Sequence, residues 1–368
     1  MPLDETLQRE WKVRLIRDAL GRIGGLDSVD PEPVRTPSEP LGYRNRMEFA
    51  LCWGGGGAPV VGFHGSGPQR DVVDVARCLL QHDEANEVLD SVRAFLIRHS
   101  SGDAWRSKAR QQVRLLIRRS ELSGEILVAL REISRPLPEA RELASSLVKR
   151  HEKVVGVVRL VVPSGRRGGT HVKVLEGRDW IEERVAGVRL RLPVASFLQV
   201  SAAGARELVN LVSEMAGDLE AARVVELYGG AGLFSMELVR RGARSAIVCD
   251  ADPGAVHSGR DAVRAAGLRG VEFIRDDVRG FVADRDVHDE VELVVANPPR
   301  SGLGKGVTKA LRTWAAARVI LVSCDPPTLA RDLKALIERG AYRVARVVPV
   351  DLFPQTAHIE TVVLLTRS

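Results

Sequence analysis

The stretch RVVELYGGAGLFS at residues 223–235 decides the fold that this sequence predicts. Its first five residues read as a buried strand, and a helical pattern follows from Met236 to Arg241. A glycine-rich turn between a strand and a helix lets the backbone approach a ligand, and the helix N-terminus offers free N–H groups. We therefore predict a nucleotide-type ligand loop around Gly230 and Gly232. Because the full G-x-G-x-x-G spacing is absent, a plain tight connection is the alternative.

The strands downstream of this loop also end in polar residues. Asp250 ends the next strand about 20 residues after the glycines, the distance at which such folds bind a ribose hydroxyl. Asp277 follows a third strand, where an acid can accept a hydrogen bond from an adenine amino group. The acids at both strand ends could instead cap helices. At the end of the third strand, we prefer that role for Asp276, the neighbour of Asp277. Asn297 follows a fourth strand, and the two prolines after it hold the chain in an extended turn.

The run VSCDPPT at residues 322–328 places Cys324 directly after the apolar stretch 317–322. A thiolate is both a strong nucleophile and a good leaving group, and a thiol at the end of a strand is presented to a cleft. We therefore interpret Cys324 as a nucleophile. The alternative for an isolated cysteine is a small buried hydrophobic residue.

The alternation of strands with helical patterns indicates an α/β fold with a doubly wound, Rossmann-like sheet. Its strands end at Glu226, Asp250, Asp277, Asn297 and Cys324. Functional residues of such folds lie at the carboxyl ends of the strands. The amino-terminal half has a mixed α+β pattern. We predict two domains, a smaller α+β domain over residues 1–190 and a doubly wound domain over residues 191–368.

Four ordered motifs resemble those of the uracil-C5 RNA methyltransferase family, whose members make 5-methyluridine in ribosomal and transfer RNA with S-adenosylmethionine. The motifs are ELYGGAGLFS at 226–235, NPPRSG at 297–302, SCDP at 323–326 and DLFPQTAHIE at 351–360. The resemblance covers nearly the whole chain, and GYRNR at 42–46, GFH at 62–64 and SFLQV at 196–200 extend it. It implies a class I methyltransferase domain at the carboxyl terminus and an RNA-recognition domain before it.

The resemblance also implies roles for individual residues. Cys324 would add to C6 of the uracil, and Glu360 would remove the C5 proton after methyl transfer. A solvated acid on an edge strand is the alternative for Glu360. The residues implied for S-adenosylmethionine are Gln199, Tyr228, Gly230, Gly232, Asp250, Asp277 and Asn297. Asn297 departs from the aspartate usual in the family, which removes a negative charge near a cationic donor.

Two other functions stay open at this point. Amino-methylating enzymes also use an Asn-Pro-Pro turn, but an aromatic residue usually follows it, whereas Arg300 follows here, and Cys324 and Glu360 would have no role. A non-catalytic RNA-binding protein with a decayed donor site is the third possibility. For the methyltransferase, the final motif resembles the ribosomal RNA members, so we expect 23S rRNA as substrate and the T-loop of tRNA as the alternative.

Composition agrees with an RNA partner. The 368 residues carry a formal net charge of +6, and basic side chains that gather in one region can neutralise a phosphate backbone. A solvated face of an arginine-rich protein is the alternative. One cluster comprises Arg106, Lys108, Arg110, Arg114, Arg118 and Arg119, beside Trp105, and a second comprises Arg166, Arg167, His171 and Lys173.

The remaining expectations concern location and cofactors. No segment reaches about 18 uninterrupted apolar residues and the start does not read as a signal peptide, so no membrane association is expected. Four scattered cysteines argue for a reducing compartment, and we expect a cytoplasmic monomer. Some relatives bind an iron-sulfur cluster through four cysteines, but Cys52 and Cys78 cannot complete such a site, so we expect neither cluster nor metal. The small amino-terminal RNA-binding barrel of many relatives is also not expected.

Overall fold

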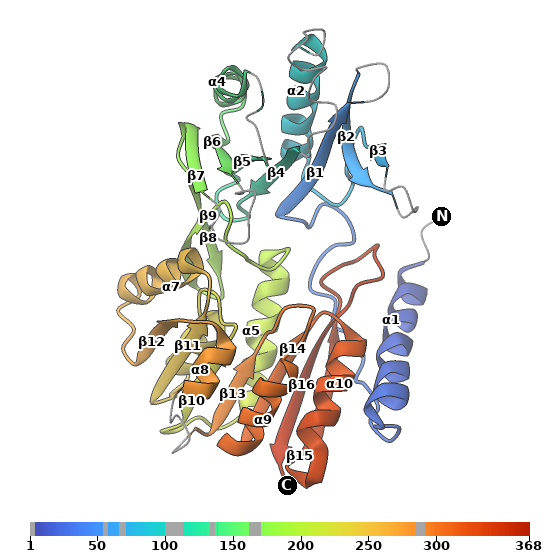
Figure 1. Cartoon of the computed structure of the whole chain (residues 1–368), viewed down its shortest axis with the longest axis vertical. Coiled ribbons are helices and arrows are strands. Elements are labelled where there is room, and N and C mark those ends of the chain that lie inside the picture. The colour runs from blue at the N-terminus through green and yellow to red at the C-terminus, as the bar shows by residue number, and fades with distance from the viewer. Residues whose placement is uncertain are drawn as a thin grey trace. The chain divides into compact units, whose positions relative to one another are not determined.

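The computed structural model describes residues 4–53, 58–65, 71–99, 113–132, 137, 139–161, 171–284 and 291–368. Its helices and strands form two compact units (Figure 1). One unit comprises Met1–Pro40, Arg184–Leu190 and Ser196–Ser368, and the other comprises Leu41–Glu183 and Arg191–Ala195. The first 40 residues thus group with the carboxyl-terminal part of the chain, in contrast to the predicted division into 1–190 and 191–368.

The first unit is built on a sheet whose described strands follow the order β12-β11-β10-β13-β14-β16-β15. Their bounds are β10 Arg223–Leu227, β11 Ser245–Asp250, β12 Val271–Arg275, β13 Leu293–Ala296, β14 Arg318–Ser323, β15 Tyr342–Val350 and β16 Glu360–Arg367. Neighbours from β12 to β14 pair in parallel, whereas β16 pairs antiparallel with both β14 and β15. The central strands are nearly continuous apolar runs, as expected for strands that are buried on both faces.

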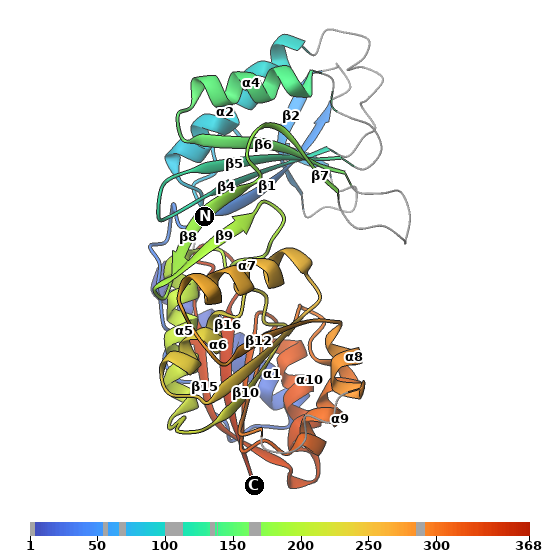
Figure 2. The same cartoon turned by 90° about the vertical axis from the view of Figure 1, so that its left-hand side faces the viewer.

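Helices cover both faces of this sheet, as Figure 2 shows for α8, α9 and α10 on one side and α5 on the other. The helices are α1 Glu5–Ala19, α5 Ala202–Ala216, α6 Leu233–Arg240, α7 Pro253–Ala265, α8 Val278–Asp284, α9 Gly304–Trp314 and α10 Pro326–Ile337, with a π-helical turn at Leu20–Gly24 and a 3-10 turn at Glu338–Gly340. Alternate strand residues serve two separate cores. Val225 packs with α1, α8, α9 and α10, whereas Val224 packs with α5 and α6. The predicted doubly wound arrangement of this part is therefore observed.

Helix α1 and the segment after it belong to this unit because their contacts are with it. Ile16 and Leu20 are buried in the same core as α10. Further along, Arg35 forms a parallel bridge with Val350 of β15, and Glu32 accepts a hydrogen bond from Arg346 at 2.7 Å. Residues that the sequence assigned to the amino-terminal domain thus extend the core of the doubly wound unit.

The second unit contains another sheet, with the described strands in the order β3-β2-β1-β4-β5-β6-β7. The bounds are β1 Arg46–Trp53, β2 Pro59–His64, β3 Val72–Asp74, β4 Val113–Arg119, β5 Ile126–Glu132, β6 Val154–Val161 and β7 His171–Gly177. Helices α2 (Asp83–His99) and α4 (Ala140–Arg150) pack on one face of it. Strands β8 (Trp180–Val185) and β9 (Val188–Pro193) form a separate two-stranded sheet, of which Arg184–Leu190 are counted with the first unit. This mixture agrees with the α+β character that the sequence predicts.

Several residues of the predicted basic clusters lie outside the described residues, namely Trp105, Arg106, Lys108, Arg110, Arg166 and Arg167. In the described part of the chain, no helix is both long enough and apolar enough to cross a membrane. The same part contains no group of three or more His, Cys, Asp or Glu side chains placed to hold a metal ion.

Candidate active site

The polar residues predicted from the sequence gather at one edge of the first unit's sheet. The register pairs Leu227 of β10 with both Cys249 of β11 and Ala296 of β13, and it pairs Ala296 with Leu321 of β14. Parallel strands in such register end at the same edge. Tyr228, Asp250, Asp277, Asn297 and Cys324 therefore come from adjacent strand ends, as predicted.

The glycine loop turns sharply at the end of β10. Tyr228 has a φ of 57°, a left-handed conformation that a non-glycine residue rarely adopts, and Gly230 and Gly232 have φ values of 55° and 74°. A Cβ at Gly232 would lie 2.8 Å from the Phe273 ring, whereas one at Gly230 would meet nothing within 4 Å. Gly232 is thus required for packing, and Gly230 borders open space.

Buried Glu226 forms a hydrogen bond with the backbone at the end of this loop. Its Oε2 accepts a hydrogen bond from the backbone N–H of Ser235 at 2.7 Å, and Glu226 is 2% exposed. Burial raises the pKa of Glu226 to about 7, against the opposing effect of the Ser235 hydrogen bonds. The side chain therefore ties the strand to the start of α6, and it does not face a ligand.

Asp250 connects the loop to the end of β11. Its Oδ2 accepts a hydrogen bond from the Gly230 N–H at 2.8 Å, and its Oδ1 accepts one from the Asp252 N–H at 2.7 Å. A carboxylate has about four lone-pair sites, so acceptor capacity remains on both oxygens. An acceptor fixed beside a glycine that borders open space fits the hydroxyl groups of a ribose.

Asp277 caps a helix, whereas the sequence favours Asp276 for this role. The Oδ1 of Asp277 accepts a hydrogen bond from the Arg279 N–H at 2.9 Å, and its carbonyl accepts one from the Phe281 N–H, also at 2.9 Å. Both bonds fix the start of α8. Burial raises the pKa of the Tyr228 hydroxyl to about 12, and the negative charge of Asp277 adds to this effect. Asp277 therefore acts electrostatically on Tyr228, and its contact with a donor stays a prediction.

Gln199 and Asn297 lie in the same unit. Gln199 is half-buried and precedes Ser201, whose Oγ caps α5 by accepting the Gly204 N–H at 2.9 Å. The backbone N–H of Asn297 donates to the Leu227 carbonyl at 3.2 Å, which aligns the ends of β13 and β10. The contacts of both side chains with a methyl donor stay predictions.

Side chains of α10 form hydrogen bonds with the backbone of the turn after Asn297. The backbone N–H of Leu303 donates to Oδ2 of buried Asp332 at 2.7 Å, and Arg331 donates to the Ser301 carbonyl at 2.7 Å. Gly302 has a φ of 78°, and a Cβ there would lie 2.3 Å from the Asp332 carboxylate. These contacts set the path of the turn that carries Arg300.

Cys324 directly follows β14 and Glu360 begins β16, and these two strands are paired. Ser323, the last residue of β14, is the register partner of Thr361 in β16. Cys324 follows Ser323 and Glu360 precedes Thr361, so the next position across the antiparallel pair joins these two residues. Directly opposite residues of antiparallel strands have Cα atoms about 5 Å apart. The structure thus brings the predicted nucleophile and the predicted base together, although 36 positions of sequence separate them.

The electrostatics of this pair involve a third residue. Burial raises the pKa of the Cys324 thiol, and the negative charge of Glu360 adds to it, whereas the charge and hydrogen bond of Arg300 lower it. Glu360 is 3% exposed, and burial raises its pKa to about 8 against the opposing charge of Arg300. Cys324 also lies just before Asp325, the N-cap of α10, and a helix N-terminus favours a thiolate.

Arg300 is the site residue whose role the sequence did not define. The sequence showed only that Arg300 follows the Asn-Pro-Pro turn, and the structure places its charge beside both Cys324 and Glu360. The neighbouring order of β13 and β14 could have indicated this, since residues that follow adjacent parallel strands lie close together.

The described arginines of the first predicted basic cluster contact protein groups. Arg118 is 2% exposed and donates to the Pro193 carbonyl at 3.1 Å, and burial lowers its pKa to about 9. Arg119 pairs with Glu84 at 3.0 Å, and Arg114 pairs with Glu48 at 3.2 Å. Because Arg118 is buried, it cannot contribute to an RNA-binding surface, and the expectation for this member of the cluster is wrong.

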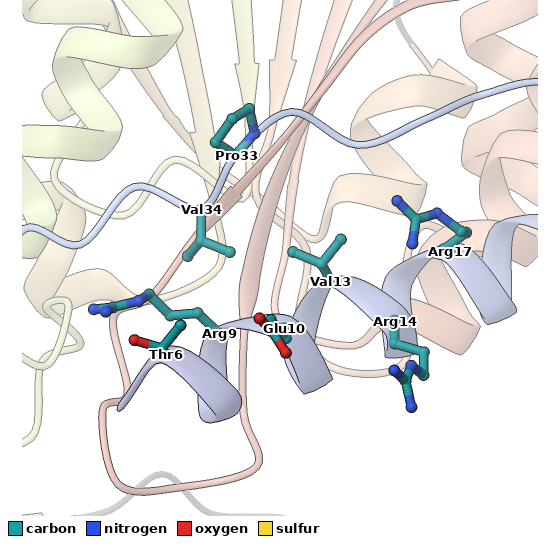
Figure 3. A pocket seen from close by; sticks show the side chains of 8 residues that line it. All are labelled: Thr6, Arg9, Glu10, Val13, Arg14, Arg17, Pro33 and Val34. Atoms are coloured by element: carbon teal, nitrogen blue, oxygen red, sulfur yellow. The ribbon is translucent and has the colours of Figure 1, made fainter. Parts of the chain in front are cut away.

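A hollow of about 510 Å³ runs along α1, as Figure 3 shows, but it is not the site described above. Its lining residues are Thr6, Arg9, Glu10, Val13, Arg14, Arg17, Pro33 and Val34. All eight come from the first 40 residues of the chain. The chemistry predicted for this protein belongs to the strand ends, where the nucleophilic and acidic side chains converge.

Known proteins resemble this chain over nearly its full length. The sequence model of the tRNA (uracil-5-)-methyltransferase family matches residues 28–368. A protein of Gloeobacter violaceus described as an uncharacterized RNA methyltransferase is 32% identical over 100% of this chain and 79% of its own length. Another, from Nitratidesulfovibrio vulgaris, is 33% identical over 98% of this chain and 78% of its own length.

A solved structure shows the same fold. The Pyrococcus abyssi tRNA (uracil-54, C5)-methyltransferase, in complex with S-adenosyl-L-homocysteine, covers 99% of this chain and 84% of its own, with a TM-score of 0.74 and 23% identity. The strand-end site lies inside the residues that the family model matches. This protein therefore belongs to the tRNA (uracil-5-)-methyltransferase family.

Proposed function

We propose that this protein transfers a methyl group from S-adenosylmethionine to C5 of a uridine in RNA, with Cys324 as nucleophile and Glu360 as base. The observation that supports this most directly is the register of β14 and β16, which sets Cys324 opposite Glu360. Family membership supplies the class of reaction. Arg300, whose charge acts on both residues, completes the catalytic group.

The chemistry follows from the weak nucleophilicity of C5 in uracil. The Cys324 thiolate adds to C6, and the C5–C6 π electrons shift toward the C4 carbonyl oxygen to give an enolate. C5 then attacks the donor's methyl carbon, whose bond to sulfur breaks as the methyl group moves to C5. Glu360 removes the C5 proton, the C5–C6 double bond re-forms, and the bond from C6 to sulfur breaks, which frees the thiolate. S-adenosylmethionine supplies an electrophilic methyl group on a cationic sulfur.

The glycine loop and the neighbouring strand ends fit this donor. Gly230 borders open space next to the fixed carboxylate of Asp250, which suits a ribose. Tyr228, Gly232, Gln199, Asp277 and Asn297 complete the proposed donor site. Asn297 retains hydrogen-bonding capacity but brings no negative charge to a cationic ligand.

Arg300 has a defined part in this cycle. Its positive charge favours the thiolate of Cys324 and the carboxylate of Glu360, and both are the reactive forms. Without it, two negative groups would face each other in a partly desolvated site, where such repulsion is strong.

For the RNA, we propose 23S rRNA, because the final motif at 351–360 resembles the ribosomal RNA members of the family. A tRNA T-loop is the second candidate, and the matched family and the Pyrococcus abyssi enzyme, both described as tRNA methyltransferases, favour it. A target uridine in folded RNA must leave its stack to reach Cys324. The described cysteines are all free, which agrees with a reducing compartment, and we propose a cytoplasmic monomer.

The decisive experiment measures tritium release from C5-labelled uridine. Unmodified 23S rRNA and tRNA are each incubated with the protein and S-adenosylmethionine, and Cys324→Ala is compared with wild type. Release from one RNA that is lost in the variant supports both the chemistry and that substrate. If neither RNA releases tritium although the donor binds, the uracil-C5 proposal fails, and amino methylation through the Asn297 turn becomes the leading alternative.

A further inference from the structure

Helix α1 is attached to the segment that leads into Glu360. This segment, residues 351–359, links β15 to β16, and the proposed function gave no role to its polar residues. Two side chains of α1 contact it, although they lie more than 330 positions away in the sequence. Both partners belong to the same compact unit.

The first contact is a buried ion pair. The Nζ of Lys12 lies 2.6 Å from Oδ1 of Asp351, and the two residues are only 2% and 4% exposed. The same ammonium donates to the Phe353 carbonyl at 3.1 Å, and Oδ1 of Asp351 also accepts the Phe353 N–H at 3.1 Å. Lys12 therefore fixes both the first acid of the segment and the backbone two residues later.

The second contact is a reciprocal pair of hydrogen bonds. The Gln8 Nε2 donates to Oε1 of Gln355, and the Gln355 backbone N–H donates to Oε1 of Gln8, both at 3.0 Å. Gln355 has a φ of 62°, a left-handed conformation that costs free energy in a non-glycine residue. The backbone bond to Gln8 supports the chain at this strained position.

Hydrogen bonds within residues 351–359 connect these contacts to the part of the segment next to Glu360. The Thr356 hydroxyl donates to the Phe353 carbonyl at 2.7 Å, and the His358 N–H donates to the Thr356 hydroxyl oxygen at 3.2 Å. Ile359, the residue before Glu360, is fully buried in the core that contains Ile16 of α1. An uninterrupted set of contacts thus joins α1 to the residue adjacent to Glu360.

We infer that Lys12 and Gln8 are positioning residues that hold residues 351–359 so that Glu360 is placed to take the C5 proton. This inference rests on the proposed function of Glu360. Neither α1 side chain touches Cys324 in the described contacts, so losing one of them should affect proton removal and leave addition to C6 and methyl transfer largely intact. A displacement of about 1 Å is enough to cost a factor of about 100 in rate.

Two rates separate these steps. Formation of a covalent adduct with 5-fluorouridine RNA reports the steps before proton removal, because fluorine at C5 cannot leave as a proton. Tritium release from C5-labelled uridine RNA reports proton removal. The variants are Gln8→Leu, which removes both hydrogen bonds without leaving a buried charge, and Lys12→Met, which removes the ion pair. Arg14→Met is the matched control on the exposed side of α1.

We expect both variants to slow tritium release by a factor of about 10 to 100, to form the 5-fluorouridine adduct at near the wild-type rate, and to accumulate RNA-linked enzyme on denaturing gels with ordinary RNA. Arg14→Met should match wild type. Equal slowing of both rates, or no slowing, overturns the inference. If Lys12→Met does not fold, the result for Gln8→Leu decides the test. If wild-type protein shows neither reaction, it is the proposed function that fails.

Discussion

Glu360 stands across the β14–β16 pair from Cys324, one position beyond the register partners Ser323 and Thr361. Burial raises the pKa of both groups, and the negative charge of Glu360 raises the pKa of the Cys324 thiol further. At neutral pH the two reactive forms are therefore both in short supply. Arg300 opposes this increase, since its positive charge lowers the pKa of both Cys324 and Glu360.

The first prediction concerns the pH dependence of catalysis. The pKa of Glu360 is raised to about 8 and that of Cys324 is raised above its ordinary value, and both must lose a proton to react. We expect kcat/KM for tritium release to increase from pH 6.5 to pH 9, steeply at the acid end where two deprotonations are needed. A profile that is flat across this range would contradict the assignment of both residues.

The second prediction concerns Arg300. Arg300→Gln removes the positive charge that lowers the pKa of Cys324 and Glu360, so the pH profile should move to higher pH. At pH 7.5 we expect a loss of activity of about 10- to 100-fold, since each pKa unit changes the reactive fraction about tenfold. Partial recovery at pH 9 would distinguish this from lost RNA binding. The exposed Arg269→Gln is the control and should follow the wild-type profile.

The third prediction concerns stability. Because the pKa of Glu360 rises from 4.5 in the unfolded chain to about 8 on folding, the folded state binds more protons between these values. Its stability therefore falls as pH rises through this window. Glu360→Gln should increase the free energy of unfolding by on the order of 5 kcal/mol at pH 9, and the gain should vanish near pH 4.

Urea unfolding at the two pH values measures this difference. Glu272→Gln is the control, because its side chain is exposed to water on β12. A Glu360→Gln variant that is equally stabilised at pH 4 and pH 9 would show that the gain comes from packing and not from ionisation.

The fourth prediction separates the two loop glycines. Gly232→Ala would place a Cβ 2.8 Å from the Phe273 ring at a φ of 74°, and we expect a loss of stability of about 2 kcal/mol or more. Gly230→Ala meets no atom within 4 Å, so its cost should stay near 1 kcal/mol. Its Cβ enters the space assigned to the donor, however, so affinity for S-adenosylmethionine should fall at least tenfold.

Calorimetric titration with the donor, together with thermal unfolding without it, tests both variants. If Gly230→Ala binds S-adenosylmethionine as wild type does, the donor does not occupy the open side of this loop.

The strand ends and the ligand loop were predictable because their signals are local. Apolar runs of strand length, glycines after a strand and prolines after Asn297 each restrict the backbone within a few residues. The same local reasoning favoured Asp276 as the helix cap, although Asp277 occupies an equally suitable position. The structure assigns the cap to Asp277 through its bond with Arg279.

Three features depended on contacts between distant parts of the chain. The membership of α1 in the carboxyl-terminal unit depends on contacts such as that between Lys12 and Asp351, which lie 339 positions apart. The burial of Arg118 depends on which sheet face its strand presents to the protein. The charge of Arg300 reaches Cys324 because β13 and β14 are neighbours in the sheet.

By itself, the sequence determined the class of sheet, the loop for a nucleotide-type ligand and the candidate nucleophile, because each is encoded by residues adjacent in the chain. Only the tertiary structure decided that β16 enters the sheet between β14 and β15. That insertion sets Glu360 against Cys324, and it arises from the packing of whole strands and helices, which no short stretch of sequence specifies.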